Sequence, residues 1–149
     1  MSAVEVRLEP IELPTYETLP EKPDPCFTKR LGAHIYPYRL QDSLTKKRVI
    51  RTYESVVLEN ELLRLTFLPD FGCRLFSVHD KLLGREVFHR NDCIKPTLIA
   101  TRGAWISGGI EFNFPVSHSV YTHSRIPFTT RRNADGSASM IFGLTERMT

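Results

Sequence analysis

Short runs of alternating apolar and polar residues, separated by turn residues, fill the sequence from Arg51 onward. The run 61–69 reads ELLRLTFLP, so its apolar residues at 63, 65 and 67 fall on one side and Arg64 and Thr66 on the other. That two-residue period is typical of a half-buried strand. No stretch keeps the 3.6-residue period of a helix for more than one or two turns. The sequence therefore predicts an all-β fold.

Turn residues divide this region into predicted hairpins. The run 52–60 (TYESVVLEN) ends in a turn at Glu59 and Asn60, after which the chain returns as the strand 61–69. Another strand is expected at 73–79, with Cys73, Leu75, Ser77 and His79 alternating against Arg74, Phe76 and Val78. The loop 80–84 (DKLLG) follows, where Gly84 can take the positive φ of a tight reversal and Asp80 is expected to bond local backbone. Asn133-Ala134-Asp135-Gly136 predicts a last hairpin between FTTRR and SASMIFGLTERM.

Prolines dominate the N-terminal region, because six of the ten lie within residues 1–45. Proline fixes φ and has no N–H to donate to a ladder, so we expect no long regular element there. Alternation in residues 4–13 (VEVRLEPIEL) still predicts a short edge strand. The chain from there to about Tyr38 is predicted to be an extended arm. We therefore divide the chain into a proline-rich arm, 1–45, and a β-sandwich domain, 46–149.

Charge and hydropathy exclude several classes of protein. The net charge is only +3, and the basic residues are dispersed apart from one cluster at residues 46, 47, 48 and 51. That distribution argues against a nucleic-acid partner. No apolar run approaches the roughly 18 residues of a membrane-spanning helix, and the first residues lack the apolar core of a secretory signal. We therefore expect a cytoplasmic protein with no membrane partner.

The cysteines predict neither a disulfide framework nor a metal site. Cys26, Cys73 and Cys93 are odd in number and far apart, which is typical of reduced thiols in the cytoplasm. No CxxC pair supplies metal ligands at short spacing. No Rossmann fingerprint, P-loop, GxSxG or HExxH motif is present either. The sequence therefore predicts no metal and no cofactor.

The segment 102–118 holds the residues best suited to binding a ligand. Within it, residues 108–115 (GGIEFNFP) are expected to form a strand, with Ile110, Phe112 and Phe114 on one face and Glu111 and Asn113 on the other. Gly108 and Gly109 allow close approach of the backbone to a ligand or a neighbouring strand. Trp105 offers a flat apolar face, and Arg102 and His118 bracket the segment with a fixed cation and a group that titrates near neutral pH.

That mixture suits a carbohydrate, because a sugar presents many hydroxyl groups and one apolar face. The alternative interpretation is that Glu111 and Asn113 face water, Trp105 belongs to the core, and His118 is a loop histidine. Arg74, at the start of a predicted strand, is a further candidate for binding the ligand, although an exposed arginine paired with an acidic residue is the competing interpretation.

Three runs together resemble a known family. They are SVVLENELLRLTFLPDFGCRLFSVHDK, IKPTLIATRGAWISGGIEFNFPVSH and NADGSASMIFGLTERM. In order and spacing they resemble a domain of unknown function found in large bacterial proteins, often ahead of tetratricopeptide repeats. That family is similar in fold to galactose mutarotase. The resemblance implies a galactose-mutarotase-like β-sandwich, or supersandwich, of which this chain is expected to hold the N-terminal half, since the family's domain is about twice as long.

The chain departs from the family pattern at three positions, with Cys73 where glycine is common, Ala104 where proline is common and Phe114 where tryptophan is common. Mutarotases use a histidine acid and a glutamate base, and their glutamate lies later in the chain than this sequence extends. That pair is therefore not carried over. Glu111 and His118 are candidates by position in the motif alone.

These observations lead to one preferred function and two alternatives. We expect a carbohydrate-active protein, with Glu111 as general acid or base, His118 as its proton partner, and Arg74, Arg102, Trp105 and Asn113 holding the sugar. The first alternative is a non-catalytic sugar-binding module of a larger, repeat-containing protein. The second is an interaction scaffold without a ligand. The sequence leaves open whether the protein is an enzyme.

Overall fold

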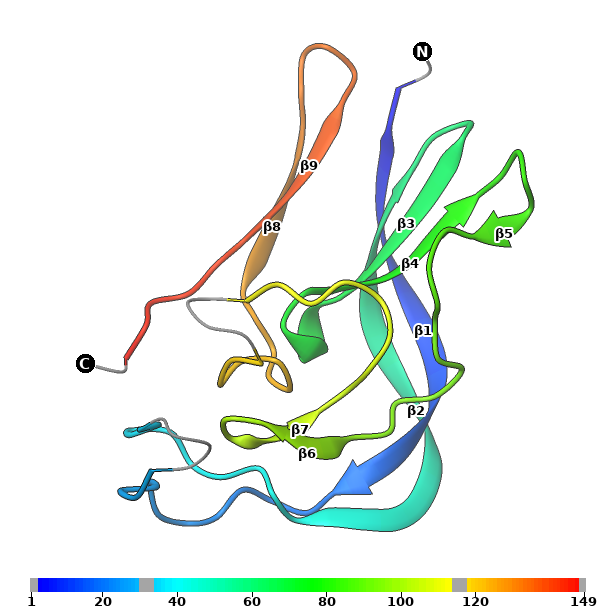
Figure 1. Ribbon diagram of the computed structural model, residues 1–149. Helices are drawn as coiled ribbons and strands as arrows, with labels where there is room; N and C mark the ends of the chain where they lie inside the picture. The colour runs from blue at the N-terminus through cyan, green and yellow to red at the C-terminus, as the bar shows by residue number, and fades with distance from the viewer. Residues whose placement is uncertain (1–2, 30–33, 114–117, 148–149) are drawn as a thin grey trace.

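The computed structural model describes residues 3–29, 34–113 and 118–147, and all its paired strands run antiparallel (Figure 1). One five-stranded sheet has the order β1 (Glu5–Thr18), β2 (Leu44–Glu59), β3 (Leu63–Leu68), β4 (Arg74–Asp80) and β5 (Arg85–Glu86). Two hairpins accompany it, β6 (Thr97–Ala100) with β7 (Gly103–Trp105), and β8 (Phe128–Arg132) with β9 (Ala138–Phe142). The described residues hold no α-helix, only the 3-10 turn η1 (Pro69–Phe71), so the all-β prediction is confirmed. In the same residues no helix is long and apolar enough to cross a membrane.

The expectation that residues 1–45 form no long regular element is wrong. β1 has 14 residues and pairs with β2 from Glu5 opposite Glu59 to Thr18 opposite Leu44. Its prolines, Pro10 and Pro14, are four residues apart, so both nitrogens face the same edge of the strand. That edge points away from β2, because the Pro14 carbonyl on it accepts a hydrogen bond from the Ile94 N–H at 2.8 Å. The ladder to β2 therefore loses no donor to either proline.

The chain between β1 and β2 doubles back on itself. The Leu19 N–H donates to the Ser43 carbonyl at 2.8 Å, and the Cys26 N–H donates to the Tyr38 carbonyl at 3.1 Å. Ile35 in this excursion is fully buried and packs in a core cluster with Val120 and other residues of the later chain. The described part of the predicted arm that follows β1 thus packs against the domain, and β1 itself belongs to the same sheet as the strands of the domain.

The predicted hairpin 52–69 is confirmed, and so is the reversal at 80–84. The hairpin after Pro127 is confirmed for residues 128–142, but its second arm, predicted to run to residue 148, ends as a strand at Phe142. Asp80 Oδ1 accepts hydrogen bonds from the N–H groups of residues 82 and 83 at 2.9 Å, and Gly84 has φ +61°. The simple alternation predicted for 73–79 is interrupted, because the register between β3 and β4 shifts after Thr66 and leaves Phe76 as an extra residue. Leu75 and Val78 consequently pack in the same cluster, while Phe76 packs in a different one.

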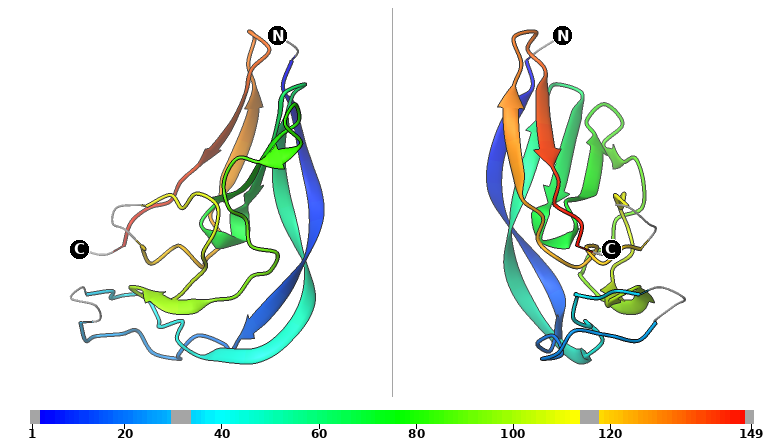
Figure 2. Two further views of the ribbon diagram at one scale, coloured as in Figure 1. Left: turned by 45° about the vertical axis from the view of Figure 1, so that its right-hand side comes forward. Right: turned by 90° about the vertical axis from the view of Figure 1, so that its left-hand side faces the viewer.

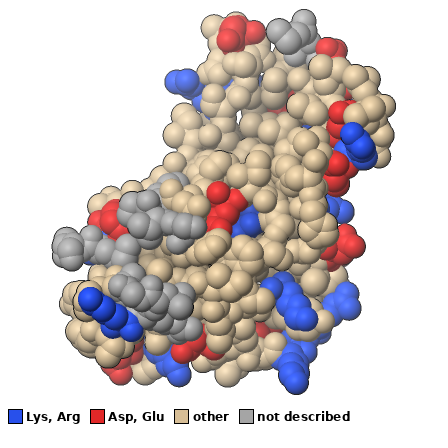
Figure 3. Space-filling view, in the orientation of Figure 1, with Lys and Arg blue, Asp and Glu red and all other residues tan. Residues whose placement is uncertain are grey.

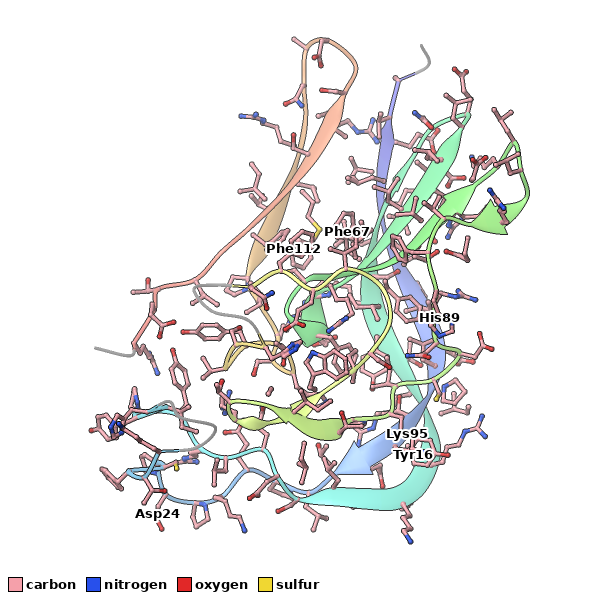
Figure 4. The ribbon with its side chains drawn as sticks, viewed as in Figure 1. Tyr16, Asp24, Phe67, His89, Lys95 and Phe112 are labelled. Carbon is pink, nitrogen blue, oxygen red and sulfur yellow. The ribbon has the colours of Figure 1, made fainter. Side chains whose placement is uncertain are left out.

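The β8–β9 hairpin and the sheet enclose one of the cores. In Figure 2 the hairpin leans toward the upper half of the sheet and covers one of its faces. Val56, Phe67 and Leu75 of the sheet are buried there, with Phe128 and Met140 of the hairpin packed against them. Figure 4 shows Phe67 and Phe112 close together in this region, so the segment after Gly109 also contributes to the core.

The apolar segment 94–101 is buried near its two ends but not in its middle. Ile94 and Ala100 are 1% exposed, but Leu98 and Ile99 on β6 are 48% and 46% exposed. Among the described residues, β6 pairs with the three-residue β7 alone, and its two large apolar side chains stay about half exposed. The three cysteines are free thiols, and Cys73 is the buried one.

Candidate functional site

The segment 108–113 is not the predicted strand. It makes a single bridge to β4, in which the Leu75 N–H donates to the Ile110 carbonyl at 3.1 Å and the Ile110 N–H donates to the Leu75 carbonyl at 2.9 Å. Gly109 has φ +66°, and a Cβ at that position would lie 2.4 Å from the Leu75 carbonyl oxygen. The backbone therefore turns immediately before Glu111 instead of running straight. Phe114, part of the predicted strand, lies outside the described residues.

Glu111 lies at the centre of a cluster of polar and aromatic side chains. Its side chain is 13% exposed. Its Oε2 accepts hydrogen bonds from Trp105 Nε1 and from His118 Nδ1, both at 2.9 Å. The Trp105 and His118 rings meet edge to face with centroids 5.2 Å apart. The other oxygen, Oε1, is buried and has no hydrogen-bond partner among the described residues. One half of the carboxylate is thus fixed and the other half is open to bonding.

Arg74 reaches the same cluster from the first residue of β4. Its side chain is only 2% exposed, and its Nη1 donates to the Gly108 carbonyl at 2.5 Å. Its Nη2 lies 4.0 Å from Glu111 Oε2, and its guanidinium carbon lies 5.9 Å from the centre of the Trp105 ring. Burial lowers the pKa of Arg74, and the charge of Glu111 opposes that shift.

The Nε and Nη2 groups of Arg74 are buried without a hydrogen-bond acceptor in the described part of the chain. Buried polar groups without partners are uncommon and costly, so each one requires an explanation. Here Nη2 of Arg74 lies 4.0 Å from Glu111 Oε2, in the carboxylate whose other oxygen atom, Oε1, is also unpaired among the described residues. A ligand that both donates and accepts hydrogen bonds would satisfy these groups together.

His118 has an unusual backbone conformation that is fixed on both sides. Its φ is +49°, a left-handed value uncommon for residues other than glycine. Its N–H donates to Asn113 Oδ1 at 3.0 Å, and its carbonyl accepts from the Thr101 N–H at 3.1 Å. The side chain is 42% exposed, so the imidazole connects the buried Glu111 with the surface. Figure 3 shows a small group of acidic and basic atoms in the otherwise uncharged middle of one face.

Two comparisons with known proteins bear on this cluster. The family model described as "Domain of unknown function (DUF5107)" matches residues 31–149, which include every residue of the cluster. The chain belongs to this family. The DUF5107 domain is also similar to a crystal structure of a TPR-domain containing protein from Parabacteroides distasonis ATCC 8503, with 29% sequence identity and a TM-score of 0.77. The match covers 89% of this chain and 23% of that protein, so the chain spans less than a quarter of its length.

Of the six residues predicted for the site, the fold of the DUF5107 domain brings five together. Glu111, His118, Trp105 and Arg74 make the contacts described above, and Asn113 joins them through the backbone of His118. Asn113 was expected to face the ligand beside Glu111. The side-chain carbonyl oxygen of Asn113 instead accepts a hydrogen bond from the His118 N–H, and this contact orients His118.

Arg102 contacts a different set of residues. Its guanidinium donates to the carbonyls of Arg39 and Val120, to the Ser124 hydroxyl and to Glu21 Oε1, at distances from 2.7 to 3.2 Å. It also lies over the Tyr38 ring. Burial lowers its pKa, and Glu21 acts in the opposite direction. The observed contacts of Arg102 thus hold the β1–β2 excursion against the rest of the DUF5107 domain.

Sequence reasoning missed two backbone contributions to the cluster. They are the Gly108 carbonyl, which accepts from Arg74, and Thr101, which fixes the carbonyl of His118. No side-chain pattern marks a backbone acceptor, so only the glycine pair at 108 and 109 hinted at the first. Among the described residues, no group of three or more His, Cys, Asp or Glu side chains is placed to hold a metal ion.

Proposed function

We propose that the protein binds a sugar or a glycoside at the Glu111 cluster and that Glu111 and His118 transfer protons to and from it. The observation that carries the proposal is the pair of unsatisfied partners, Glu111 Oε1 and the Nε and Nη2 groups of Arg74. A sugar hydroxyl donates one hydrogen bond and accepts others, so one hydroxyl can donate to Glu111 while it accepts from Arg74. Trp105 adds the aromatic surface that a sugar's apolar face requires.

The arrangement also suits acid–base chemistry. Glu111 Oε1 is free to take a proton from, or return it to, a hydroxyl of the bound sugar, while Oε2 is held by Trp105 and His118. His118 is half exposed, so it can exchange a proton with solvent and pass it toward the carboxylate. In this role His118 is the proton partner of Glu111, and Asn113 and Thr101 keep its imidazole in place.

We further propose that the antiparallel sheet and the β8–β9 hairpin form part of a galactose-mutarotase-like β-sandwich. Two features support this: the hairpin packs face to face on the sheet, and the shared core between them is built from both. In such a fold the Glu111 cluster belongs to the concave face. The reaction class that suits a single central carboxylate is mutarotation or epimerisation, since glycoside hydrolysis needs a second carboxylate about 5 to 10 Å from the first.

A second function is favoured by the comparison with the TPR-domain containing protein. Because the match occupies only 23% of that protein, the domain can serve as one module of a larger chain. The alternative proposal is therefore a non-catalytic sugar-binding module that delivers an assembly with a repeat region to a glycan. Binding would then depend on the aromatic face and on Arg74 more than on the charge of Glu111.

Calorimetric titration of the protein with a panel of mono- and disaccharides tests the first step. We expect one or more sugars to bind, and a panel without any binding would overturn both proposals. For each sugar that binds, exchange between anomers is followed by NMR for the parent, Glu111→Gln and the matched control Glu61→Gln, which lies in the exposed β2–β3 turn. Catalysis predicts that only Glu111→Gln slows exchange.

The binding module predicts a different pattern. Trp105→Phe keeps an apolar ring but removes the N–H that holds Glu111, whereas Trp105→Ala removes both. If the protein only binds, Trp105→Ala abolishes binding, Glu111→Gln weakens it modestly, and no variant changes a rate of anomer exchange above the uncatalysed one. If the protein is an enzyme, Trp105→Phe reduces the rate more than it reduces affinity.

A further inference from the structure

We propose that Asn91 is a positioning residue for this site, acting through the Ser107–Gly108 backbone to orient Arg74. The inference rests on the proposed function for its biological meaning, but it concerns contacts that can be tested without a sugar. Asn91 lies on the segment between β5 and β6, outside the motif that contains Glu111 and His118. Figure 4 shows His89 on the same segment, where the segment runs beside the five-stranded sheet.

Every hydrogen-bonding group of the Asn91 side-chain amide is engaged. Its Nδ2 donates to the Ser107 carbonyl at 2.9 Å and to the Ser107 hydroxyl at 2.7 Å. Its Oδ1 lies 3.0 Å from His89 Nε2, which donates to it when that nitrogen carries the proton. The backbone of His89 takes part as well, because its carbonyl accepts from the Gly109 N–H at 3.2 Å. The segment thus holds the 107–109 turn at Ser107 and at Gly109.

The next link leads from the turn to Arg74. The Gly108 carbonyl is the only acceptor within hydrogen-bonding distance of the Arg74 guanidinium in the described part of the chain, at 2.5 Å from Nη1. The direction of that carbonyl therefore decides where the two unpaired groups of Arg74 point. The Gly108 carbonyl belongs to the Gly108–Gly109 peptide, whose N–H is held by the His89 carbonyl, and Asn91 holds the preceding Ser107–Gly108 peptide. Removal of the Asn91 amide frees that preceding peptide, so Gly108 can shift and the guanidinium then loses its fixed orientation beside Trp105 and Glu111. Residues that do not touch the ligand themselves contribute to a site in this way, by fixing the side chains that do.

Trp105 makes the effect measurable, because it is the single tryptophan in the sequence. Its indole N–H donates to Glu111 and its ring lies 5.9 Å from the Arg74 guanidinium carbon. A ¹H–¹⁵N NMR spectrum contains one indole cross-peak, which reports on the site whether or not a sugar is present. Asn91→Ala should displace this cross-peak. Ser107→Ala removes one of the two Asn91 contacts and should displace it less, in the same direction.

The matched control is Asn133→Ala. Asn133 also holds a turn with its Nδ2 group, which donates to the hydroxyls of Ser137 and Ser139, but it does so in the β8–β9 hairpin. If Asn91 is merely a turn residue, the two alanine variants will lower the thermal midpoint without moving the indole cross-peak. If the proposal is right, only Asn91→Ala and Ser107→Ala move it. An unmoved cross-peak in both of these variants overturns the proposal.

A second measurement uses the sugar that binds the parent most tightly in the calorimetric panel. Asn91→Ala is expected to weaken its binding about tenfold, the effect of losing roughly one well-placed hydrogen bond. Asn133→Ala should bind as the parent does. Unchanged affinity in Asn91→Ala also overturns the proposal. If the parent binds no sugar, the proposed function fails, and the indole cross-peak alone decides whether Asn91 positions Arg74.

Discussion

Replacement of Gly109 by alanine is the sharpest test of how the candidate site is built. Gly109 has φ +66° and lies against β4, where a Cβ would be 2.4 Å from the Leu75 carbonyl oxygen. Backbone cannot yield to that contact as the end of a flexible side chain can. The substitution must therefore push the 108–111 segment off β4 and break the bridge between Leu75 and Ile110, with its two hydrogen bonds.

The cost has two parts, and a second glycine separates them. The left-handed conformation costs a residue with a Cβ about 1–2 kcal/mol. The two backbone hydrogen bonds contribute about 1 kcal/mol each, so Gly109→Ala should lower the free energy of unfolding by about 3–4 kcal/mol. Gly84 has nearly the same φ, +61°, and a Cβ added there would meet no atom within 4 Å. Gly84→Ala should therefore cost only the first part, about 1–2 kcal/mol.

Urea unfolding followed by circular dichroism measures both variants against the parent. With a denaturant dependence of about 2 kcal/mol per molar urea, the Gly109→Ala midpoint should lie about 1 M below that of Gly84→Ala. Gly109→Ala should also displace the indole cross-peak of Trp105, whereas Gly84→Ala should leave it in place. Equal midpoints for the two variants would show that the close approach of Gly109 to β4 contributes nothing, and would refute this account of the site.

Three further predictions concern buried or partly buried groups outside the Glu111 cluster. Burial lowers the pKa of His123 to about 4, below its ordinary value, so the unfolded chain binds the proton first as the pH falls. The free energy of unfolding should therefore drop by about 2.5 kcal/mol between pH 7 and pH 4.5. An equal drop in His123→Gln would contradict this. Burial raises the pKa of Cys73 to about 12, so at pH 8 mass spectrometry after alkylation should find the other two cysteines modified and Cys73 intact until urea is added. Arg102→Gln should lower the free energy of unfolding by about 3 kcal/mol, since it leaves buried partners unpaired. Limited proteolysis of this variant should then cut the β1–β2 excursion first. A digestion pattern like that of the parent would count against the role of Arg102 in holding the excursion.

Local patterns predicted the hairpins well because the information for them is local. The turn at 80–84 is determined by Asp80, which bonds the next N–H groups, and by Gly84, and both signals are readable in five residues. The same holds for the turn at 133–136, where Asn133 and Asp135 bond within the turn. In each case the residues that determine the conformation are also the residues that adopt it.

The predictions that were wrong concern features that depend on residues far away in the sequence. Pro10 and Pro14 argue against a strand unless it is known that they face the edge away from β2, and that depends on the pairing with residues 50 and 54. The extra residue at Phe76 depends on the register with β3. The turn at Gly109 depends on the backbone of Leu75, which lies 34 positions earlier. A two-residue period in residues 108–115 could therefore not reveal that the strand would be broken.

The candidate site shows why residue types were easier to predict than their roles. Composition placed Glu111, Trp105 and His118 in one motif, and they do meet, because a stretch of 14 residues can fold back only over a short distance. Roles depend on which atoms remain unpaired after folding. Asn113 accepts a hydrogen bond from the His118 N–H with its carbonyl oxygen, and all three nitrogens of the Arg102 guanidinium donate to protein groups, so these contacts serve the fold. Arg74, a weaker candidate in the sequence, keeps its buried Nε and Nη2 groups without an acceptor among the described residues, in the same cluster as the unpaired Oε1 atom of Glu111. The ligand that we propose for this site therefore follows from the unpaired atoms of Arg74 and Glu111 more than from the motif that contains Glu111.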